Sequence, residues 1–232
     1  MERLAQVAEW LDGPLDDEQA LGDNLRDLSR INRLFGGVSL SERAIDALAG
    51  GRDRLDILDV GTGAADIPLA LIARARAGGQ TMTVTALDSR PEVLAAARRI
   101  EPRLGGTPGL SFAVADGARL PFADDSFDIA HASMVVHHLE PDEAEVFLRE
   151  LARVSRLGVV VNDLVRSRLN WIGALVLTRT IATARFTRHD GPLSVRRAYT
   201  RRELGELLRR AGLRPVRLER GFANHRVAIA AR

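Results

Sequence analysis

Three aspartates at the ends of apolar runs are the first candidates for chemistry in this sequence. Asp59 lies at the end of the run 55–60, and two glycines, Gly61 and Gly63, follow directly. Asp88 and Asp116 end two later runs. An aspartate in such a place is usually a turn former or a helix cap. Three in succession, with a glycine turn that lets a ligand approach the main chain, favour a nucleotide-like ligand instead.

The residues after the glycine turn argue against the two commonest nucleotide motifs. A dinucleotide fingerprint has a third glycine where the helix N-terminus receives the pyrophosphate. That position is Asp66 here, and its carboxylate would repel a pyrophosphate. A P-loop needs a lysine, and the sequence contains none. We therefore disfavour NAD and FAD, and exclude a P-loop more firmly.

A ligand with a ribose, an adenine and a positive charge, but no phosphate, matches the three carboxylates better. Asp88 can accept both hydrogen bonds of a ribose diol, and Asp116 can accept one from an adenine amino group. Asp59 can attract an ammonium group, directly or through water. S-adenosyl-L-methionine carries all three features, so it is the predicted cofactor.

The elements that must position these residues alternate between strand and helix. Apolar runs predict strands at 55–60, 82–88, 110–116, 127–136 and 157–165, with helices at 66–77, 91–100 and 141–155. Two last strands, 213–222 and 225–232, have a link too short for a parallel crossover and must be antiparallel. This pattern predicts an α/β fold: a mostly parallel sheet covered on both faces, with an antiparallel C-terminal strand. Ligands of such sheets bind at the carboxyl ends of the strands.

Residues 1–50 contain helical patterns and no convincing strand. Helices are predicted over 2–11, 17–35 and 41–49. We expect an N-terminal helical cap over 1–50 and a catalytic domain over 51–232, with a helical lid insertion at about 166–199.

The motifs 58–68 (LDVGTGAADIP), 86–98, 114–139 (VADGARLPFADDSFDIAHASMVVHHL) and 147–156 together resemble a known family. They are similar to successive motifs of class I S-adenosylmethionine-dependent methyltransferases, in the UbiE-like or type 11 group. The resemblance covers roughly 55–165 and implies a Rossmann-like, doubly wound, seven-stranded sheet whose last strand is antiparallel. It places Asp59, Gly61, Thr62 and Gly63 at the methionine end of the cofactor, Asp88 and Ser89 at the ribose, and Asp116 with Gly117 at the adenine. The sequence departs from the family pattern at two places: Ala65 replaces a third glycine, and 155–158 replaces a Pro-Gly-Gly turn. These departures weaken the assignment to a subfamily but not the prediction of the cofactor.

Methyl transfer from a sulfonium needs mainly positioning, but a hydroxyl acceptor must also lose a proton. His138, and after it His137, follow the fourth predicted strand and are the candidate catalytic bases. Shaping the strand exit is their alternative role. Asp163, at the end of the fifth strand, could orient a histidine or a substrate hydroxyl, or cap the next segment. The histidines show no metal-ligand spacing with acids on one helix, so no metal is expected.

The insertion 166–199 is richer in apolar residues than a solvated linker. With the N-terminal helices it could form a lid over a lipophilic acceptor. Secondary candidates for gripping the acceptor are His189, Asp190, Arg196 and Tyr199, and Arg33 is a weak candidate for the methionine carboxylate. Packing on the sheet and ordinary salt bridges are the alternative for these residues.

Composition limits the other classes of function. The 33 basic residues are all arginine and nearly balance 31 acids, so a high isoelectric point does not imply a nucleic-acid partner. Cysteine is absent, and no signal peptide or membrane-spanning run is evident, so we expect a cytoplasmic chain without stable membrane insertion.

The predicted function is methyl transfer to oxygen or carbon of a small phenolic, quinone-like or polyketide acceptor, within secondary metabolism. A nucleic-acid methyltransferase and a non-catalytic, cofactor-binding regulatory protein are the alternatives. A homodimer is compatible with all three.

Overall fold

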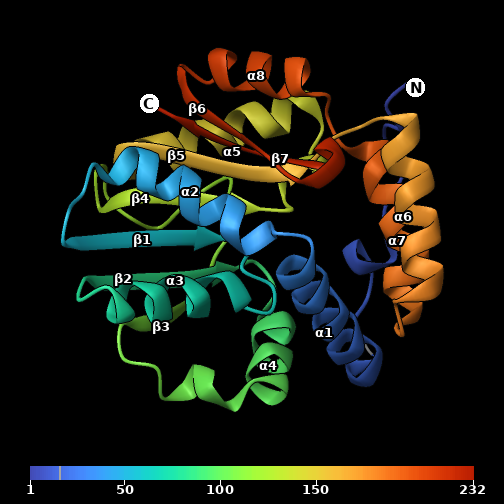
Figure 1. Ribbon diagram of the computed structural model, residues 1–232, viewed down its shortest axis with the longest axis horizontal. Coiled ribbons are helices and arrows are strands. Elements are labelled where there is room, and N and C mark those ends of the chain that lie inside the picture. Colours follow the sequence, from blue (N-terminus) through green and yellow to red (C-terminus); the bar gives the residue numbers. More distant parts are fainter. Residues whose placement is uncertain (16) are drawn as a thin grey trace.

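The computed structural model describes residues 1–15 and 17–232, which form a central sheet with helices on both faces (Figure 1). The strands are β1 Arg54–Val60, β2 Thr81–Asp88, β3 Leu110–Val114, β4 Phe127–Ser133, β5 Ser155–Leu164, β6 Pro215–Arg220 and β7 Arg226–Ala231. The helices are α1 Glu18–Leu34, α2 Gly37–Ala49, α3 Asp66–Ala77, α4 Pro91–Ile100, α5 Pro141–Val154, α6 Arg168–Thr180, α7 Arg185–Arg197 and α8 Arg201–Arg210. Among the described residues, no helix is both long enough and apolar enough to cross a membrane.

The sheet has the strand order β3-β2-β1-β4-β5-β7-β6. Strands β1 to β5 pair in parallel, and β7 is antiparallel to both β5 and β6. The predicted Rossmann-like, doubly wound sheet with an antiparallel C-terminal strand is therefore confirmed. The strand order reverses between β1 and β4, and a ligand crevice opens at the carboxyl ends of strands at such a point.

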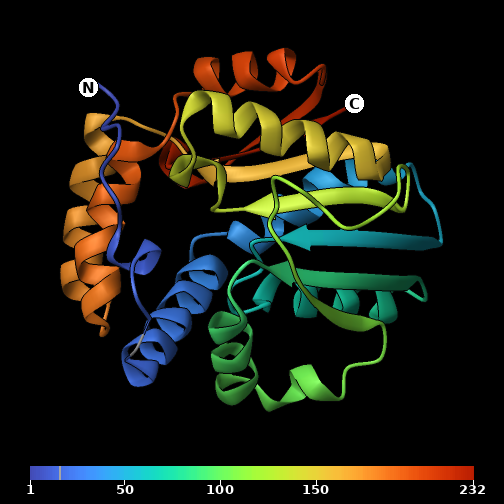
Figure 2. The ribbon, with the colours of Figure 1, turned by 180° about the vertical axis from the view of Figure 1, so that it is seen from behind.

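Two helix layers bury the strands from both sides. Side chains of α5 and α8 form one core with one face of the sheet, and α2 and α3 form another core with the opposite face. Figures 1 and 2 show these two layers from opposite sides. Because both faces are covered, Val159, Val160 and Val161 of β5 are all fully buried and do not alternate with polar residues.

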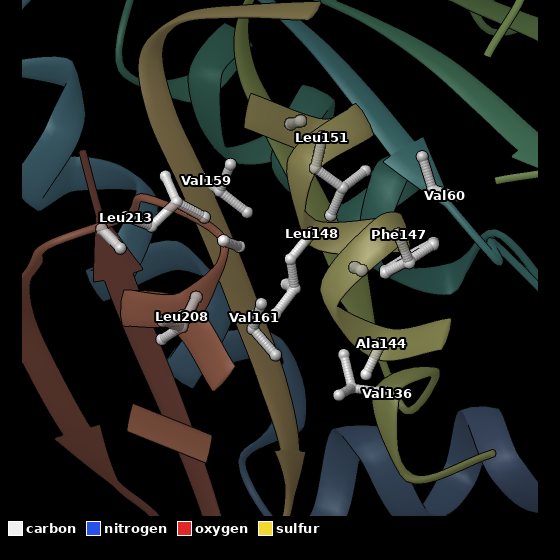
Figure 3. Packing of buried hydrophobic residues seen from close by; sticks show 14 of the residues in the cluster. Val60, Val136, Ala144, Phe147, Leu148, Leu151, Val159, Val161, Leu208 and Leu213 are labelled. Atoms are coloured by element: carbon white, nitrogen blue, oxygen red, sulfur yellow. The ribbon is translucent and has the colours of Figure 1, made fainter. Parts of the chain in front are cut away.

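The core beneath α5 is closely packed. Leu148 and Leu151 are fully buried and lie beside the strand valines in Figure 3. Shortening either leucine to alanine is expected to cost about 2–5 kcal/mol of stability, because the cavity left behind closes only in part. This core holds β1, β4 and β5 in register, and with them the strand ends that carry the candidate residues.

Helices α1, α6 and α7 gather beyond the carboxyl ends of the parallel strands, where the arrowhead of β1 points in Figure 1. Helices α6 and α7 pack on each other, and α7 also contacts α1. The segment 1–15 runs along α7 and is tied to it by the bond from Leu4 N–H to Arg196 O, 3.0 Å. The first 15 residues and α7, far apart in the sequence, thus meet beside the crevice.

The predicted helix at 2–11 is wrong. This segment is irregular apart from a short 3₁₀ turn at Trp10–Asp12. Its backbone donors bond to other elements instead: Gln6 N–H to the Glu140 carboxylate at 2.9 Å, and Trp10 N–H to the Asp190 carboxylate at 2.9 Å. Tertiary partners satisfy the donors that a helix would have used, so the helical apolar rhythm is overridden.

Two strands end earlier than the sequence predicts. Strand β3 ends at Val114 rather than 116, because the Asp116 carboxylate accepts from Ala118 N–H and begins a turn. Strand β4 ends at Ser133 rather than 136, because Met134 has a positive φ of 61°. The residues after β4, among them Met134, Val135, His137 and His138, are thereby released from the sheet and line the crevice.

Candidate active site

A cavity of about 860 Å³ lies at the carboxyl ends of β1, β2 and β4, beneath α1, α6 and α7. Polar residues of the strand ends line one part, and apolar residues of the surrounding helices line the other. The predicted residues that line it are Asp59, Gly61, Thr62, Gly63, Asp88, Ser89, His137 and His138. The structure therefore brings together eight of the ten primary cofactor-binding and catalytic candidates, and Asp190 of the secondary candidates also lines the cavity.

The glycine turn is held against the end of β2. Gly61 N–H and Thr62 N–H both donate to Leu87 O, at 2.8 and 2.9 Å. Gly61 has a φ of +72°, and a Cβ there would collide with the Val135 side chain. A larger residue at 61 is excluded by both conformation and space.

The Asp88 carboxylate is fixed beside this turn. It accepts hydrogen bonds from Gly63 N–H at 3.2 Å and from Arg90 N–H at 3.1 Å. Burial raises the pKa of Asp88, although these two donors and Arg90 oppose the shift. Each oxygen keeps a second acceptor site. The carboxylate can therefore serve the two hydroxyls of a diol, as the sequence predicts.

Asp59 belongs to a buried polar chain that the sequence does not reveal. Its Oδ1 lies 2.5 Å from His131 Nδ1, and His131 Nε2 lies 2.7 Å from Ser41 Oγ on α2. Asn162 donates to Ser41 Oγ at 2.7 Å, and Arg226 donates to Asn162 Oδ1 at 2.6 Å. All five side chains are buried.

This polar network runs from Arg226 to Asp59. A guanidinium can only donate, so the Arg226 bond makes Asn162 Oδ1 an acceptor. The Asn162 amide nitrogen donates to Gly37 O at 2.8 Å and to Ser41 Oγ at 2.7 Å. Ser41 Oγ is hydrogen-bonded to His131 Nε2, and His131 Nδ1 to Asp59 Oδ1, so one oxygen of Asp59 is engaged while the carboxylate still lines the cavity. The second oxygen can attract an ammonium group.

Arg226 is a further residue at this end that the sequence did not identify. It is buried, lines the cavity, and donates to Asn32 Oδ1 at 2.6 Å as well as to Asn162. Burial lowers its pKa to about 10, against the attraction of Asp163 and Asp66. The weak candidate Arg33 is exposed and does not line the cavity. A cation beside the crevice is nevertheless present, from the start of β7.

Asp116 and Gly117 lie apart from the other candidates. Asp116 is exposed and neither residue lines the cavity. A Cβ on Gly117 would come within 2.6 Å of the Phe147 ring and 2.9 Å of Val60, so packing explains this glycine. Their predicted contact with adenine stays a prediction.

His137 and His138 lie on the cavity wall, each with an aspartate behind it. His137 is buried, and its Nδ1 lies 2.7 Å from Asp163 Oδ1. His138 is 22% exposed, and its Nδ1 lies 2.9 Å from Asp12 Oδ1. The prediction that Asp163 could orient a histidine is thus confirmed, and the same oxygen of Asp163 also accepts from Leu164 N–H at 2.7 Å.

Glu9 is the third member of this cluster. Its side chain is buried, and its oxygens lie 3.8 Å from His137 Nε2 and 3.9 Å from His138 Nε2. Burial raises the pKa of Glu9 to about 7 against the attraction of His138. Burial alone would raise the pKa of Asp12, but the neighbouring His138 and the hydrogen bonds from Glu9 N–H and Arg197 lower it. No local sequence signal marks Glu9 or Asp12 as site residues, because only the path of segment 1–15 along α7 brings them here.

The remaining wall is apolar. Its largest contributions come from α1, α6 and α7: Leu25, Leu28, Ile31, Leu169, Ile172, Val176, Leu177 and Val195. Leu169, Ile172 and Val176 are 71, 50 and 58% exposed and lie on one side of α6, at the mouth of the cavity. An apolar acceptor could enter here without desolvating charge.

The other candidates of the insertion serve mainly the fold. Asp190 accepts from Trp10 N–H and Leu11 N–H, and His189 stacks on the Trp10 ring at 4.0 Å. Tyr199 donates to Leu139 O at 2.7 Å and does not line the cavity. Arg196 is exposed. The insertion therefore shapes the cavity through packing more than through polar groups aimed into it.

Comparison with known proteins places this geometry in context. Residues 57–158 match a family model described as a methyltransferase domain. Over 72 residues the chain is 40% identical to the ubiquinone/menaquinone biosynthesis C-methyltransferase UbiE of Rickettsia felis, covering 31% of this chain and 29% of that protein. Over 148 residues it is 35% identical to the methyltransferase GfsG of Streptomyces halstedii, covering 59% of this chain and 51% of that protein. The chain thus spans about half the length of these relatives or less.

A solved structure extends the likeness beyond the matched segment. The fold is similar to that of a SAM-dependent methyltransferase from Aquifex aeolicus, with a TM-score of 0.64 and 20% identity. The alignment covers 90% of this chain and 97% of that chain. At this identity the similarity concerns the fold, and it includes helices outside 57–158.

Proposed function

We propose that this chain, whose residues 57–158 match a methyltransferase domain, is a class I S-adenosylmethionine-dependent methyltransferase that moves a methyl group to oxygen or carbon of a small lipophilic acceptor. The domain match and the fold confirm the family recognised from the motifs, and S-adenosyl-L-methionine is the cofactor of that family. The acceptor that we propose is phenolic, quinone-like or a polyketide. The UbiE relative, a quinone-biosynthesis enzyme by name, supports this class.

The residues at the strand ends fit the cofactor. Thr62 Oγ1 is buried on the cavity wall and lacks a hydrogen-bond partner within the described residues, so a polar ligand would satisfy it. We assign Asp88 to the ribose diol, Asp59 to the ammonium group, and Arg226 to the carboxylate of the same amino-acid end. When bound, the cofactor supplies a methyl group on a positively charged sulfur.

The chain's own contribution to the reaction is positioning and exclusion of water. Helices α1, α6 and α7 cover the cavity with apolar side chains, so an acceptor held there is oriented toward the strand ends. We propose that His138, the more accessible of the paired histidines, contacts the reacting oxygen of the acceptor. His137 is held behind it by Asp163.

One observation carries the proposal: a single cavity joins the carboxylates suited to the cofactor with an apolar chamber and the histidine cluster. A purely regulatory protein would need the first part only. The secondary-metabolic role and cytoplasmic location remain predictions.

The test is transfer of a radiolabelled methyl group from S-adenosylmethionine to a panel of phenols, quinones and polyketides. We expect turnover with at least one member, and a strong loss in His138→Ala with cofactor affinity retained. Undiminished turnover in this variant would contradict the role of His138. Tight cofactor binding without transfer to any class would favour the regulatory alternative, and labelling of RNA would favour a nucleic-acid methyltransferase.

A further inference from the structure

Three groups with lone pairs converge on one point of the cavity wall. The Glu9 carboxylate, His137 Nε2 and His138 Nε2 each offer one ligand atom, and these atoms all lie within 4.8 Å of one another. Glu9 Oε1 is buried and has no hydrogen-bond partner within the described residues. A buried, unpartnered carboxylate oxygen is costly, so this point calls for a ligand.

The carboxylates behind the histidines bear on what kind of ligand suits the point. His137 Nδ1 is hydrogen-bonded to Asp163 at 2.7 Å, and because a carboxylate accepts, this Nδ1 carries the hydrogen. His138 Nδ1 lies 2.9 Å from Asp12 Oδ1 but lacks the geometry of a hydrogen bond. A neutral imidazole with its hydrogen on Nδ1 presents a lone pair on Nε2, the atom that faces Glu9 in both rings. Carboxylate–histidine pairs with the second ring nitrogen turned inward are the usual support of a metal-bound histidine.

The distances agree with a shared cation. The Nε2 atoms lie 3.8 and 3.9 Å from the Glu9 oxygens, too far for hydrogen bonds. Tetrahedral ligands at zinc distances are about 3.4 Å apart, so small side-chain rotations would close the set. From this geometry we propose that Glu9, His137 and His138 bind a divalent transition-metal ion of the zinc class, with a fourth position open to the cavity.

Nearby charges favour a cation at this point. The carboxylates of Glu9, Asp12 and Asp163 surround it, and Arg197 is the guanidinium within salt-bridge distance of Glu9. Arg197 NH1 lies 3.9 Å from Glu9 Oε1 but 2.7 Å from Asp12 Oδ2, so its hydrogen bond goes to Asp12. The Glu9 carboxylate is left to face the histidines.

Such an ion deepens the proposed function and rests on it. An acceptor hydroxyl in the open position would lose its proton to solvent more readily, because the cation stabilises the resulting oxyanion. With both Nε2 atoms bound to metal, His138 would act as a ligand rather than as a base. The sequence-based expectation of no metal considered acids on one helix, whereas Glu9 reaches the histidines from a distant segment.

The experiment uses the full chain without an affinity tag, stripped with a chelator and dialysed against micromolar Zn²⁺. Elemental analysis is expected to find about one zinc per chain. Glu9→Gln is expected to lower zinc affinity at least ~100-fold, and Asp12→Asn, which removes a positioning residue, about 10- to 100-fold. His225→Gln is the matched control, because His225 lines the same cavity but bonds to Phe222 O and is not one of the three proposed ligands, and its zinc content should equal that of the wild type.

Two further measurements separate the outcomes. Wild-type chain loaded with Co²⁺ should show the visible absorption of a four- or five-coordinate site, which needs no substitution that could disturb folding. Calorimetry of S-adenosylmethionine should give the same affinity in every variant. A wild-type chain that retains no zinc, or a Glu9→Gln variant that retains as much as the wild type, overturns the site. Unchanged cofactor binding in that case would leave the proposed methyltransferase function standing.

Discussion

The cofactor end and the acceptor end of the cavity are built in different ways. The cofactor end is built mainly from strand ends and short turns within residues 57–158, where backbone N–H groups hold the Gly61 turn and the Asp88 carboxylate. The acceptor end joins segment 1–15 and α1 to α6 and α7, which are far apart in the sequence. A site built from residues close in the sequence suits a cofactor that all members of a family share. An acceptor site built from distant segments can change without disturbing the cofactor site. The following variants, ordered by expected effect, test this division.

The largest effect is expected from Asp88→Ala, which removes the carboxylate assigned to the ribose. Two charge-assisted hydrogen bonds of about 1.5–3 kcal/mol each would be lost, so cofactor affinity should fall ~100-fold or more in calorimetry. Asp116→Ala is the comparison, and we expect less than ~10-fold because Asp116 is exposed outside the cavity. Equal losses in the two variants would contradict the placement of the ribose at Asp88.

At the acceptor end, Asp190→Asn is expected to act on the acceptor alone. Its two oxygens accept from Trp10 N–H at 2.9 Å and Leu11 N–H at 3.1 Å and hold segment 1–15 on α7. The asparagine can accept only one of these bonds well, so the KM for the acceptor should rise about 10-fold, equivalent to ~1.4 kcal/mol. Cofactor affinity should stay within 2-fold. Asp142→Asn is the control, because the Asp142 side chain is 94% exposed and pairs with Arg210 at the surface. A larger loss of cofactor than of acceptor binding would mean that the two ends are not separate.

Asp27→Asn is expected to reduce stability and to do so only where the carboxylate is ionised. Asp27 of α1 accepts from Thr183 N–H and Ala184 N–H, both at 2.8 Å, which joins α1 to the start of α7. Burial alone would raise its pKa, but these donors, the Thr183 hydroxyl and Arg30 lower it. The free energy of unfolding at pH 7 should therefore fall by about 1–3 kcal/mol in the variant.

The sign of the pH dependence follows from the lowered pKa. The stabilisation is complete above the ordinary aspartate value of ~3.9 and is lost as the pH falls through the lower folded-state value. Urea unfolding of both proteins at pH 7 and in acid tests this. A difference that persists unchanged below both values would show that the charge of Asp27 is not its source.

The smallest effect is expected from Ala65→Gly, at the place of the missing family glycine. Ala65 has a φ of +54°, which costs an alanine about 1 kcal/mol, but its buried Cβ contributes a similar amount of packing. The two terms oppose each other, so the melting temperature and cofactor affinity should change little. A ~10-fold gain in cofactor affinity would contradict this expectation, because it would show that the Ala65 methyl group keeps the backbone from its best approach to the cofactor.

The sequence predicted the cofactor end well because its signals are local. Gly61 indicates a turn directly after one apolar run, and Asp88 indicates the end of the next strand. Glu9 and Arg226 could not be predicted, because nothing nearby distinguishes them from surface charges. Glu9 reaches the cavity only because segment 1–15 runs along α7, and Arg226 only because β7 lies between β5 and β6 in the sheet. The wrong helix at 2–11 has the same origin, since the carboxylates of Glu140 and Asp190 capture its backbone donors.

The polar chain that ends at Asp59 limits how this molecule can be recombined with its relatives. Ser41, on α2, is an interior link of that chain, between Asn162 and His131. A chimera spliced at residue 50 would take α2, and with it the residue at position 41, from the relative. Without a hydroxyl at that position, the hydrogen bonds that orient His131 and the Asp59 carboxylate would be interrupted. A splice between Gly36 and Gly37, just before α2, would keep Ser41 with its partners. For protein engineering, α2 therefore belongs with the sheet domain, and an exchangeable N-terminal segment should end with α1.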